Sequence, residues 1–343
     1  MEKNNRLEHL NIARGFAILL VVILHVFVPE IRGGNRIYFT IFMCISSLFM
    51  PLYTMLSGYL FERGYEKYRQ SGFRSFILRK FQGLMIPYLT VSVLSYAGIG
   101  IVFTLPKLDS VLTRAGYVRF KIQEAIFQIL TLEGHIDRHL WFLYSLFIVF
   151  ILTFIFGSFF KSPVGLLTVT VIYCAPVFFP MPELAERVCR MLLFFQSGRY
   201  TALIDKYAQK KYLPPTAFIF TALLTVQRFG WLEQFRLPNN IFNIFIGIAG
   251  TLVVFCLSLI ITGNRVGRII SKVGDYSFVI YLLHQPFIIS GVSGILLMYT
   301  RLPHIVICSV TFVLGILLPS LAEKFIVRRS ETLRLLFLGD LKK

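Results

Sequence analysis

Two ionisable residues, Arg14 and His25, interrupt the apolar stretch "ARGFAILLVVILHVFVPE" (residues 13–30). An α-helix has about 3.6 residues per turn, so their separation places both on one helix face, about 16 Å apart along the axis. A buried imidazole can exchange a proton near neutral pH, as a general base does. A guanidinium group pairs bidentately with phosphate oxygens. The pair therefore indicates proton chemistry at one end of a helix and anion binding at the other.

Each of these two residues also has a structural interpretation. Arg14 can be an interfacial anchor near the cytoplasmic surface, where Lys and Arg are enriched. His25 can be a core histidine whose hydrogen bonds are satisfied. Because ionisable side chains inside a membrane are costly and mostly functional, the sequence favours the catalytic interpretation for both.

A second candidate region lies in "VGDYSFVIYLLHQPFI" (residues 273–288), where Ser277, Tyr281 and His284 have the spacing of one helix face. Pro286 cannot donate a hydrogen bond to the carbonyl of Leu282, which leaves an acceptor that needs a partner or lines a cavity. A histidine beside such a kink indicates a substrate pathway. The alternative is a structural hydrogen bond between helices.

The stretch "RHLWFLYSLF" (residues 138–147) begins at the expected outer boundary of the membrane. His139 follows His135, Asp137 and Arg138, and we expect it to meet an external polar acceptor. Trp141 can stack on a sugar or can simply anchor the helix at the water–lipid boundary, where Trp is enriched.

These residues must be positioned by membrane helices. The chain has 343 residues, of which 56% are hydrophobic and 15% charged, whereas a soluble domain carries about a quarter charged residues. Several windows of about 20 residues are nearly free of charge, which is the length that crosses a bilayer. We predict an all-α polytopic membrane protein with a single domain, residues 1–343. The ten predicted spans are residues 10–28, 37–60, 81–105, 140–160, 164–181, 188–204, 213–229, 241–262, 275–297 and 304–325.

The net charge of +18 follows from this topology. With both termini cytoplasmic, the inside segments hold roughly twice as many Lys and Arg residues as the outside segments. We therefore expect the lipid bilayer, and no nucleic acid, as a partner. The longest external loop is residues 106–139, in which "VRFKIQEAIFQILTL" has helical apolar spacing suited to the membrane interface. Residues 326–343 form a short cytoplasmic tail, and scattered cysteines with no paired histidines predict no metal site.

The chain resembles the integral-membrane acyltransferase family 3 in five stretches that occur in the family's order. The first is "LNIARGFAILLVVILH", in which an arginine and a histidine are separated by ten residues. The others are "PLYTMLSGYLF" (51–61), "FILRKFQGLMIPYL" (76–89), "RHLWFLYSLF" (138–147) and "VGDYSFVIYLLHQPFI" (273–288). The third stretch departs from the family pattern, because Phe81, Gln82 and Gly83 follow Lys80 where basic residues usually recur.

The resemblance implies transfer of an acyl group, most simply acetyl from cytoplasmic acetyl-CoA, to a hydroxyl of a cell-surface or lipid-linked carbohydrate. It implies a multi-pass protein of the bacterial plasma membrane. Arg14 and His25 would be the catalytic residues, with His25 as general base or acyl relay. The donor-binding residues would be Arg14, Arg79, Lys80 and Ser57, and the acceptor-binding residues His139, Trp141, Tyr281 and His284.

Two other function classes fit the same helices. A transporter or glycan flippase would also bury charges, although the sequence has no inverted repeat and no paired broken helices. A membrane sensor or assembly scaffold would need no catalytic residues. The sequence does not name the acyl group, the acceptor sugar or the oligomeric state.

Overall fold

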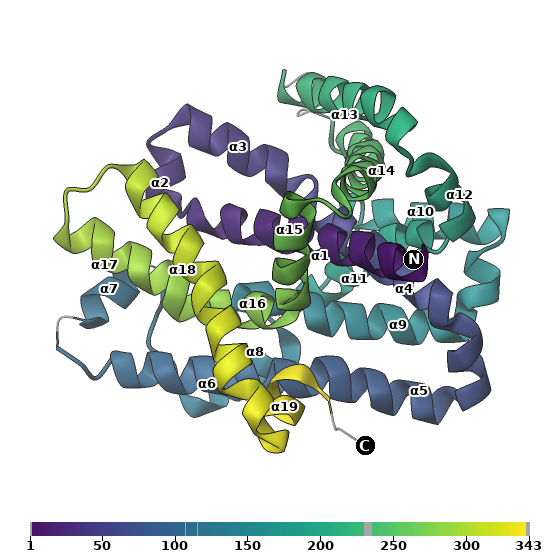
Figure 1. Cartoon of the computed structure of the whole chain (residues 1–343). Coiled ribbons are helices and arrows are strands. Elements are labelled where there is room, and N and C mark those ends of the chain that lie inside the picture. The colour runs from purple at the N-terminus through teal and green to yellow at the C-terminus, as the bar shows by residue number, and fades with distance from the viewer. Residues whose placement is uncertain (1, 107, 115, 230–234, 341–343) are drawn as a thin grey trace. The chain divides into compact units, whose positions relative to one another are not determined.

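The computed structural model describes residues 2–106, 108–114, 116–229 and 235–340, and every regular element in these ranges is a helix (Figure 1). This confirms the predicted all-α fold. Lys107 and Ala115 of the predicted external loop and residues 341–343 of the predicted tail lie outside the described residues.

The elements in chain order are α1 (Glu2–Val26), α2 (Pro29–Gly33), α3 (Arg36–Ser46), α4 (Phe49–Ser71), α5 (Phe73–Lys80), η1 (Phe81–Met85), α6 (Ile86–Val102), α7 (Leu108–Arg114), α8 (Ile122–Thr131), η2 (Arg138–Leu140), α9 (Trp141–Phe160), α10 (Pro163–Cys174), η3 (Ala175–Val177), α11 (Glu183–Gly198), α12 (Thr201–Tyr207), η4 (Lys210–Tyr212), α13 (Leu213–Arg228), α14 (Arg236–Ile261), α15 (Arg265–Asp275), α16 (Ser277–Leu283), η5 (His284–Gly291), α17 (Val292–Tyr299), α18 (His304–Phe325), η6 (Val327–Arg329) and α19 (Glu331–Leu338).

Seven helical stretches in the described residues are long and apolar enough to cross a membrane, which makes this an integral, multi-pass membrane protein. They are Glu8–Val26, Arg36–Ser71, Phe73–Val102, Arg138–Phe160, Leu237–Ile261, Ser277–Tyr299 and His304–Arg329. The predicted spans 164–181, 188–204 and 213–229 coincide with the shorter helices α10, α11 and α13. The count of ten spans and the cytoplasmic position of both termini therefore stay predictions.

The chain divides into two compact units, which are described separately. Unit 1 comprises Met1–Leu20, Met43–Ile77 and Ile148–Asp275. Unit 2 comprises Val21–Phe42, Leu78–Phe147 and Tyr276–Lys343. The single domain proposed from the sequence stays a prediction.

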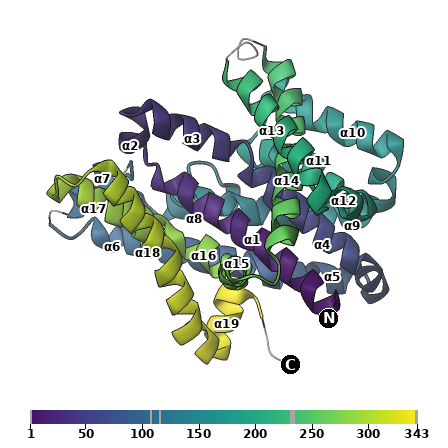
Figure 2. The same ribbon diagram turned by 45° about the horizontal axis from the view of Figure 1, so that its top comes forward.

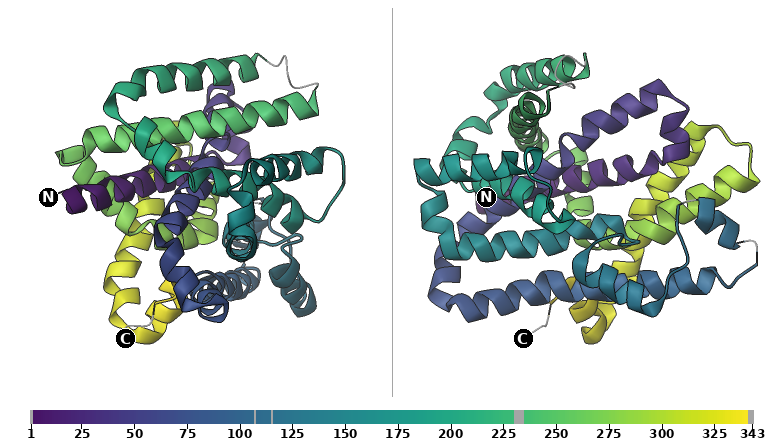
Figure 3. Two further views of the ribbon diagram at one scale, coloured as in Figure 1. Left: turned by 90° about the vertical axis from the view of Figure 1, so that its right-hand side faces the viewer. Right: turned by 180° about the vertical axis from the view of Figure 1, so that it is seen from behind.

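In unit 1, α4 and α11 pack closely because each carries a glycine at the contact. A Cβ atom on Gly58 would lie 2.0 Å from the carbonyl oxygen of Phe195, and one on Gly198 would lie 2.0 Å from that of Met55. Small residues let membrane helices approach to this distance. Helix α14 lies beside α13 and also packs against α4, and the α13–α14 pair is visible in both views of Figure 3.

Unit 1 also buries charge. The side chain of Arg199 is fully buried, its Nε donates to the Glu62 carboxylate at 2.8 Å, and its Nη1 donates to the Gly157 carbonyl at 2.8 Å. Glu62 also pairs with Lys161. Gln196 accepts a hydrogen bond from Arg199. A buried charge is tolerated when it is paired in this way, which explains how α11 carries these polar residues.

In unit 2, α18 packs against α16 (Figure 2) and also against η5, and α19 packs against α6. Helix α8 forms within the predicted external loop, as its apolar spacing indicated. Glu124 accepts a hydrogen bond from the Lys121 backbone N–H and so caps the first turn. The outward face of α8 exposes four apolar side chains, whereas its inward face carries Gln128, which accepts a hydrogen bond from the Tyr96 hydroxyl.

Candidate functional site

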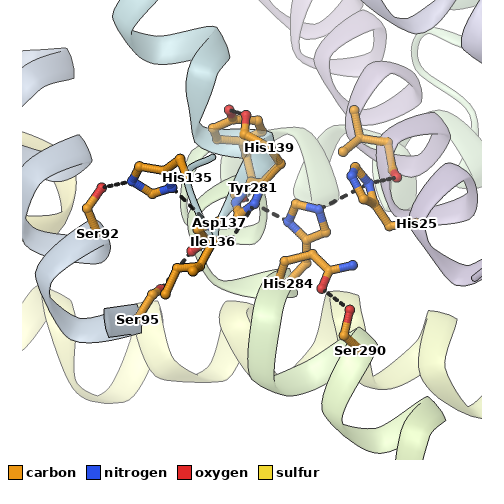
Figure 4. Close-up of polar contacts among 12 residues, drawn as sticks. His25, Ser92, Ser95, His135, Ile136, Asp137, His139, Tyr281, His284 and Ser290 are labelled. Carbon is orange, nitrogen blue, oxygen red and sulfur yellow. Dashed lines mark hydrogen bonds and ion pairs between the residues drawn. The ribbon is translucent and has the colours of Figure 1, made fainter. Parts of the chain in front are cut away.

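Three imidazoles meet inside unit 2 (Figure 4). His25 comes from the last turn of α1, His139 from the short helix η2, and His284 from the start of η5. The ring centroid of His284 lies 4.9 Å from that of His25 and 4.7 Å from that of His139, and the centroids of His25 and His139 are 6.2 Å apart. The sequence predicted functions for all three histidines, and the fold brings them together.

The backbone fixes the proton positions on two of these rings. His25 Nδ1 lies 2.8 Å from the Val21 carbonyl oxygen, so Nδ1 carries the proton and Nε2 keeps a lone pair. His284 Nδ1 lies 2.9 Å from the Ile280 carbonyl and 2.8 Å from the Tyr281 carbonyl, so it too is the protonated nitrogen. The lone pair on His284 Nε2 faces His25 Nδ1 at 3.4 Å.

The predicted helix break positions His284. Gln285 leaves the helical conformation, with φ −120° and ψ 160°, directly before Pro286. The Ile280 carbonyl still accepts the backbone N–H of His284, which ends α16. The His284 ring turns back along α16, and its Nδ1 lies within hydrogen-bond distance of the Ile280 and Tyr281 carbonyls.

His139 is held by a carboxylate rather than by a carbonyl. Its Nδ1 lies 2.8 Å from Asp137 Oδ1, and both side chains are almost fully buried. The second carboxylate oxygen of Asp137 accepts a hydrogen bond from the Ser95 hydroxyl at 2.7 Å. The Tyr281 hydroxyl donates to the His139 carbonyl. His139 Nε2 is buried and has no hydrogen-bond partner among the described residues.

His135 differs from His139 although only Asp137 and two other residues separate them. The Asp137 backbone N–H donates to His135 Nδ1 at 3.0 Å, so the proton of this ring lies on Nε2, which donates to Ser92 Oγ at 3.2 Å. Burial lowers the pKa of His135 to about 4, which keeps the ring neutral.

The carboxyl group of Asp137 is ionised despite its burial. Burial raises its pKa, but attraction to the His139 imidazole and hydrogen bonds from His139 and Ser95 outweigh that effect and hold the pKa below its usual value. The site therefore contains one fixed carboxylate beside the histidines.

A cavity of about 650 Å³ adjoins these groups. Its lining comprises His25, Pro29, Gly116, Tyr117, Val118, Gln128, Gly134, His135, Ile136, Asp137, Arg138, His139, Gln285 and Ser290. Its volume lies in the range of small-ligand pockets, about 300–1,000 Å³. The walls offer amide, hydroxyl and imidazole groups, which suit a ligand with many hydroxyls.

Tyr281 and His284, both expected to bind the acceptor, lie against the His139 ring. Trp141 does not line the cavity within the described residues, and its ring packs edge-on against Phe142 with centroids 6.1 Å apart. Its predicted contact with the acceptor stays a prediction.

The residues expected to bind the donor lie elsewhere in the chain. In unit 1, Arg14 is half-buried on α1 and donates to Asn11 Oδ1 at 3.2 Å, and Asn11 donates to Asp275 at 2.8 Å. Ser57, also in unit 1, donates to the Tyr53 carbonyl of its own helix. Arg79 and Lys80 end α5, at the border of unit 2. Their binding of a donor stays a prediction.

Four residues of the site had no role predicted from the sequence: Asp137, Ser95, His135 and Ser92. The run "HIDRH" contained a usable signal, because it places an aspartate two residues before one histidine and two residues after another. The serines carried no such signal, since they lie more than 40 residues earlier on α6. No group of three or more His, Cys, Asp or Glu side chains in the described ranges is arranged to hold a metal ion.

Comparison with known protein families gave a match over most of the chain. A model of the acyltransferase 3 family, described as "Acyltransferase domain", matches residues 7–321. No curated protein and no solved structure matched the chain. The matched range contains all three clustered histidines, and it also contains Arg14.

Proposed function

Since the chain belongs to the acyltransferase 3 family and is a membrane acyltransferase, we propose that it transfers an acetyl group from cytoplasmic acetyl-CoA to a hydroxyl of a carbohydrate in the bacterial cell envelope. The observation that carries this proposal is the cluster of His25, His139 and His284 beside a polar cavity. Free imidazole nitrogens are the groups that such a transfer needs, because a hydroxyl is a weak nucleophile until a base accepts its proton.

The proposed donor site is at Arg14, where a half-buried guanidinium can pair with phosphate oxygens of coenzyme A. Its hydrogen bond to Asn11 uses one of five N–H groups, which leaves donors for a ligand. Arg79 and Lys80 are the proposed further contacts to the donor phosphates, and Ser57 is a weaker candidate because its hydroxyl already donates to Tyr53.

The proposed acceptor site is the cavity of unit 2. Gln128, Gln285 and Ser290 supply amide and hydroxyl groups of the kind that bind sugar hydroxyls. The Ser290 hydroxyl donates to the Gln285 side-chain oxygen at 2.6 Å, which leaves the Gln285 amide N–H groups for a ligand. An uncharged or weakly charged carbohydrate suits these walls better than a polyanion, since Arg138 is the one cation among the described lining residues.

In the proposed reaction, the acceptor oxygen bonds to the thioester carbonyl carbon and loses its proton to an imidazole. The carbon–sulfur bond then breaks, and the sulfur leaves as the thiol after it takes up a proton. His25 acts as the base or as the relay for the acyl group, through its unprotonated Nε2. General base catalysis contributes about a hundred- to ten-thousand-fold to such a rate.

The test uses membranes from cells that produce the protein, supplied with acetyl-labelled acetyl-CoA. The expected result is label on the surface glycan with the wild type, and little label with His25→Ala at equal protein level. Wild-type membranes that leave the glycan unlabelled, or His25→Ala membranes that label it at the normal rate, would overturn the proposal. Mass spectrometry of glycan from cells with and without the gene identifies the acyl group.

A further inference from the structure

We propose that Asp137 is a positioning residue that fixes His139 as the proton acceptor for the hydroxyl of the acceptor molecule. This inference rests on the proposed function and adds a second histidine with a defined chemical role. It starts from an asymmetry in the cluster: His25 and His284 are held by backbone carbonyls, whereas His139 is held by a buried carboxylate.

The first step concerns the tautomer of His139. An ionised carboxylate only accepts hydrogen bonds, so at 2.8 Å Asp137 Oδ1 requires the proton of the neutral ring on Nδ1. The lone pair then lies on Nε2. A negative charge beside the ring also stabilises the imidazolium that forms when Nε2 accepts a proton. Both effects are what a base needs.

The second step concerns the geometry that holds the pair. The Asp137 side chain cannot rotate without loss of the Ser95 hydrogen bond to its other oxygen, at 2.7 Å. The backbone of His139 is bound by the Tyr281 hydroxyl. Carboxylate and imidazole are thus anchored by side chains from two other helices, α6 and α16, so the pair is formed before any ligand enters.

The third step concerns the free nitrogen. His139 Nε2 is buried without a hydrogen-bond partner among the described residues, and His139 and Asp137 both line the cavity. A buried polar atom left unpaired destabilises the folded protein, because it has lost its hydrogen bond to water. Since His139 lines the cavity but its Nε2 is closed to water-sized groups, a ligand hydroxyl reaches this nitrogen after a shift of the ring toward the cavity. That hydroxyl then supplies the missing hydrogen bond, and its proton is the one that must leave in the reaction.

His135 provides an internal contrast. It lines the same cavity, but its Nδ1 accepts a backbone N–H and its Nε2 donates to Ser92, so both ring nitrogens are occupied. Of the two histidines that flank Asp137, only His139 keeps a free lone pair. The role of base therefore belongs to His139, and His135 supports the loop.

The proton balance is simple. His139 Nε2 takes the hydroxyl proton as the new ester bond forms and the carbon–sulfur bond breaks. The imidazolium then releases this proton, directly or through water, and the departing sulfur takes up one proton to leave as the thiol. No oxidant or other reactant is needed. The ionisable groups that face His139 are His25 from α1, Tyr281 and His284 from α16 and η5, and Asp137 and His135 from its own loop. His25 keeps the proposed role of relay for the acyl group.

The test has a structural readout that does not depend on activity. Full-length protein labelled with ¹⁵N-histidine is placed in nanodiscs, and His139→Gln identifies the His139 signals. At pH 7 we expect a protonated Nδ1 and an unprotonated Nε2 in the wild type, and a changed tautomer in Asp137→Asn, because an amide can donate to Nδ1. A wild-type spectrum with the proton on Nε2 would overturn the inference even if acyl transfer is observed.

The second readout is the rate of label transfer to glycan in membranes. We expect Asp137→Asn to lower the rate about 100-fold or more, as in other sites where a carboxylate orients a histidine base. The acidic limb of its pH–rate profile should move to lower pH, which a merely structural role would not cause. In the His139→Gln background, Asp137→Asn should have no further effect, because the two residues act as one unit.

The control is Asp109→Asn, which removes a half-buried aspartate of the same unit that does not line the cavity. We expect its transfer rate to equal that of the wild type. If Asp137→Asn also equals the wild type while the wild type labels glycan, the inference fails and the proposed function stands. If the wild type labels nothing, the proposed function fails, and the spectrum still decides the role of Asp137.

Discussion

Both units bury polar side chains, but they satisfy them differently. In unit 1, Arg199 is paired with Glu62, Gly157 and Gln196, and the guanidinium carbon lies 5.2 Å from the ring centroid of Tyr65. In unit 2, Asp137 is the one fixed charge that pairs with the clustered imidazoles among the described residues, and these imidazoles adjoin a cavity. Each unit leaves a buried nitrogen without a hydrogen-bond partner in the described part of the chain, Nη2 of Arg199 and Nε2 of His139. The Arg199 charge is balanced by a carboxylate and joins helices, whereas His139 lines a cavity and can act on a substrate.

This difference predicts that substitutions in the unit 1 network lower stability, whereas substitutions in the histidine cluster of unit 2 lower activity. The largest expected effect is at His25. We expect His25→Gln to lower acyl transfer by about a hundred- to ten-thousand-fold, because the imidazole that lines the cavity is lost. The temperature of unfolding should change little, since His25 is only partly buried. Transfer assays and thermal-shift measurements on the same membranes check this. The control is His304→Gln at the exposed start of α18, and equal losses in both variants would contradict the comparison.

The opposite result is expected in unit 1. Glu62→Gln leaves the buried Arg199 with no carboxylate partner, and breaking a buried ion pair costs about 3 kcal/mol. The unfolding temperature should fall clearly, whereas activity per folded molecule should not. Glu183→Gln breaks an exposed pair with Arg187 and should have almost no effect on stability. A normal unfolding temperature for Glu62→Gln would show that the network does not stabilise unit 1.

Acidification should lower the stability of unit 2, because His135 is buried as the neutral form. The pKa of His135 in the folded protein, about 4, lies below the usual value of about 6.5. Between these two pH values the unfolded chain therefore binds a proton at His135 that the folded chain does not bind. The contribution of His135 to the free energy of unfolding is therefore fully present above pH 6.5 and is lost as the pH drops toward 4. The free energy of unfolding should fall by about 2 kcal/mol between pH 7 and pH 4.5. The lowered pKa of Asp137 has the same sign and acts at still lower pH.

Unfolding temperatures measured at pH 7 and pH 4.5 check this for the wild type and for His135→Gln, which cannot titrate. We expect a smaller drop for the variant. Equal drops would show that His135 is protonated in the folded protein at pH 4.5.

The smallest effect is expected at the close contact between α4 and α11. Gly58→Ala places a methyl group against the Phe195 carbonyl and should cost about 1–3 kcal/mol. Gly33→Ala, where no atom lies within 4 Å of the added Cβ, is the matched control. Thermal unfolding distinguishes the two, and equal stability would mean that α4 and α11 separate without cost.

The sequence predicted features that depend on neighbours along the chain. The hydropathy pattern predicted the helical membrane fold, and the spacing of apolar residues predicted α8. Pro286 predicted the helix break beside His284. The shorter helices α10, α11 and α13 have 12, 16 and 16 residues, so their length leaves open whether they cross the membrane. Helix α11 also buries a polar side chain, Gln196, which donates to Thr153 of α9.

Contacts between distant segments were not predictable in the same way. Glu62 and Arg199 are 137 residues apart, and Ser95 and Asp137 are 42 apart, so no local period connects them. The three histidines were each recognised singly, but their spacing in the sequence contains no information on a shared centre. The tautomers of the histidines could not be predicted from the sequence either, since they depend on which backbone or side-chain atom lies beside each ring nitrogen.

Helix α8 has one further consequence. Its outward face exposes Ile122, Ile126, Phe127 and Leu130, while Gln128 on its other side lines the cavity and binds Tyr96. An apolar face of this kind is at its lowest free energy in the headgroup region of a bilayer. We therefore expect lipid to act as a mechanical support for one wall of the cavity. Turnover should then depend on the thickness and composition of the surrounding nanodisc, and should weaken in short-chain detergent.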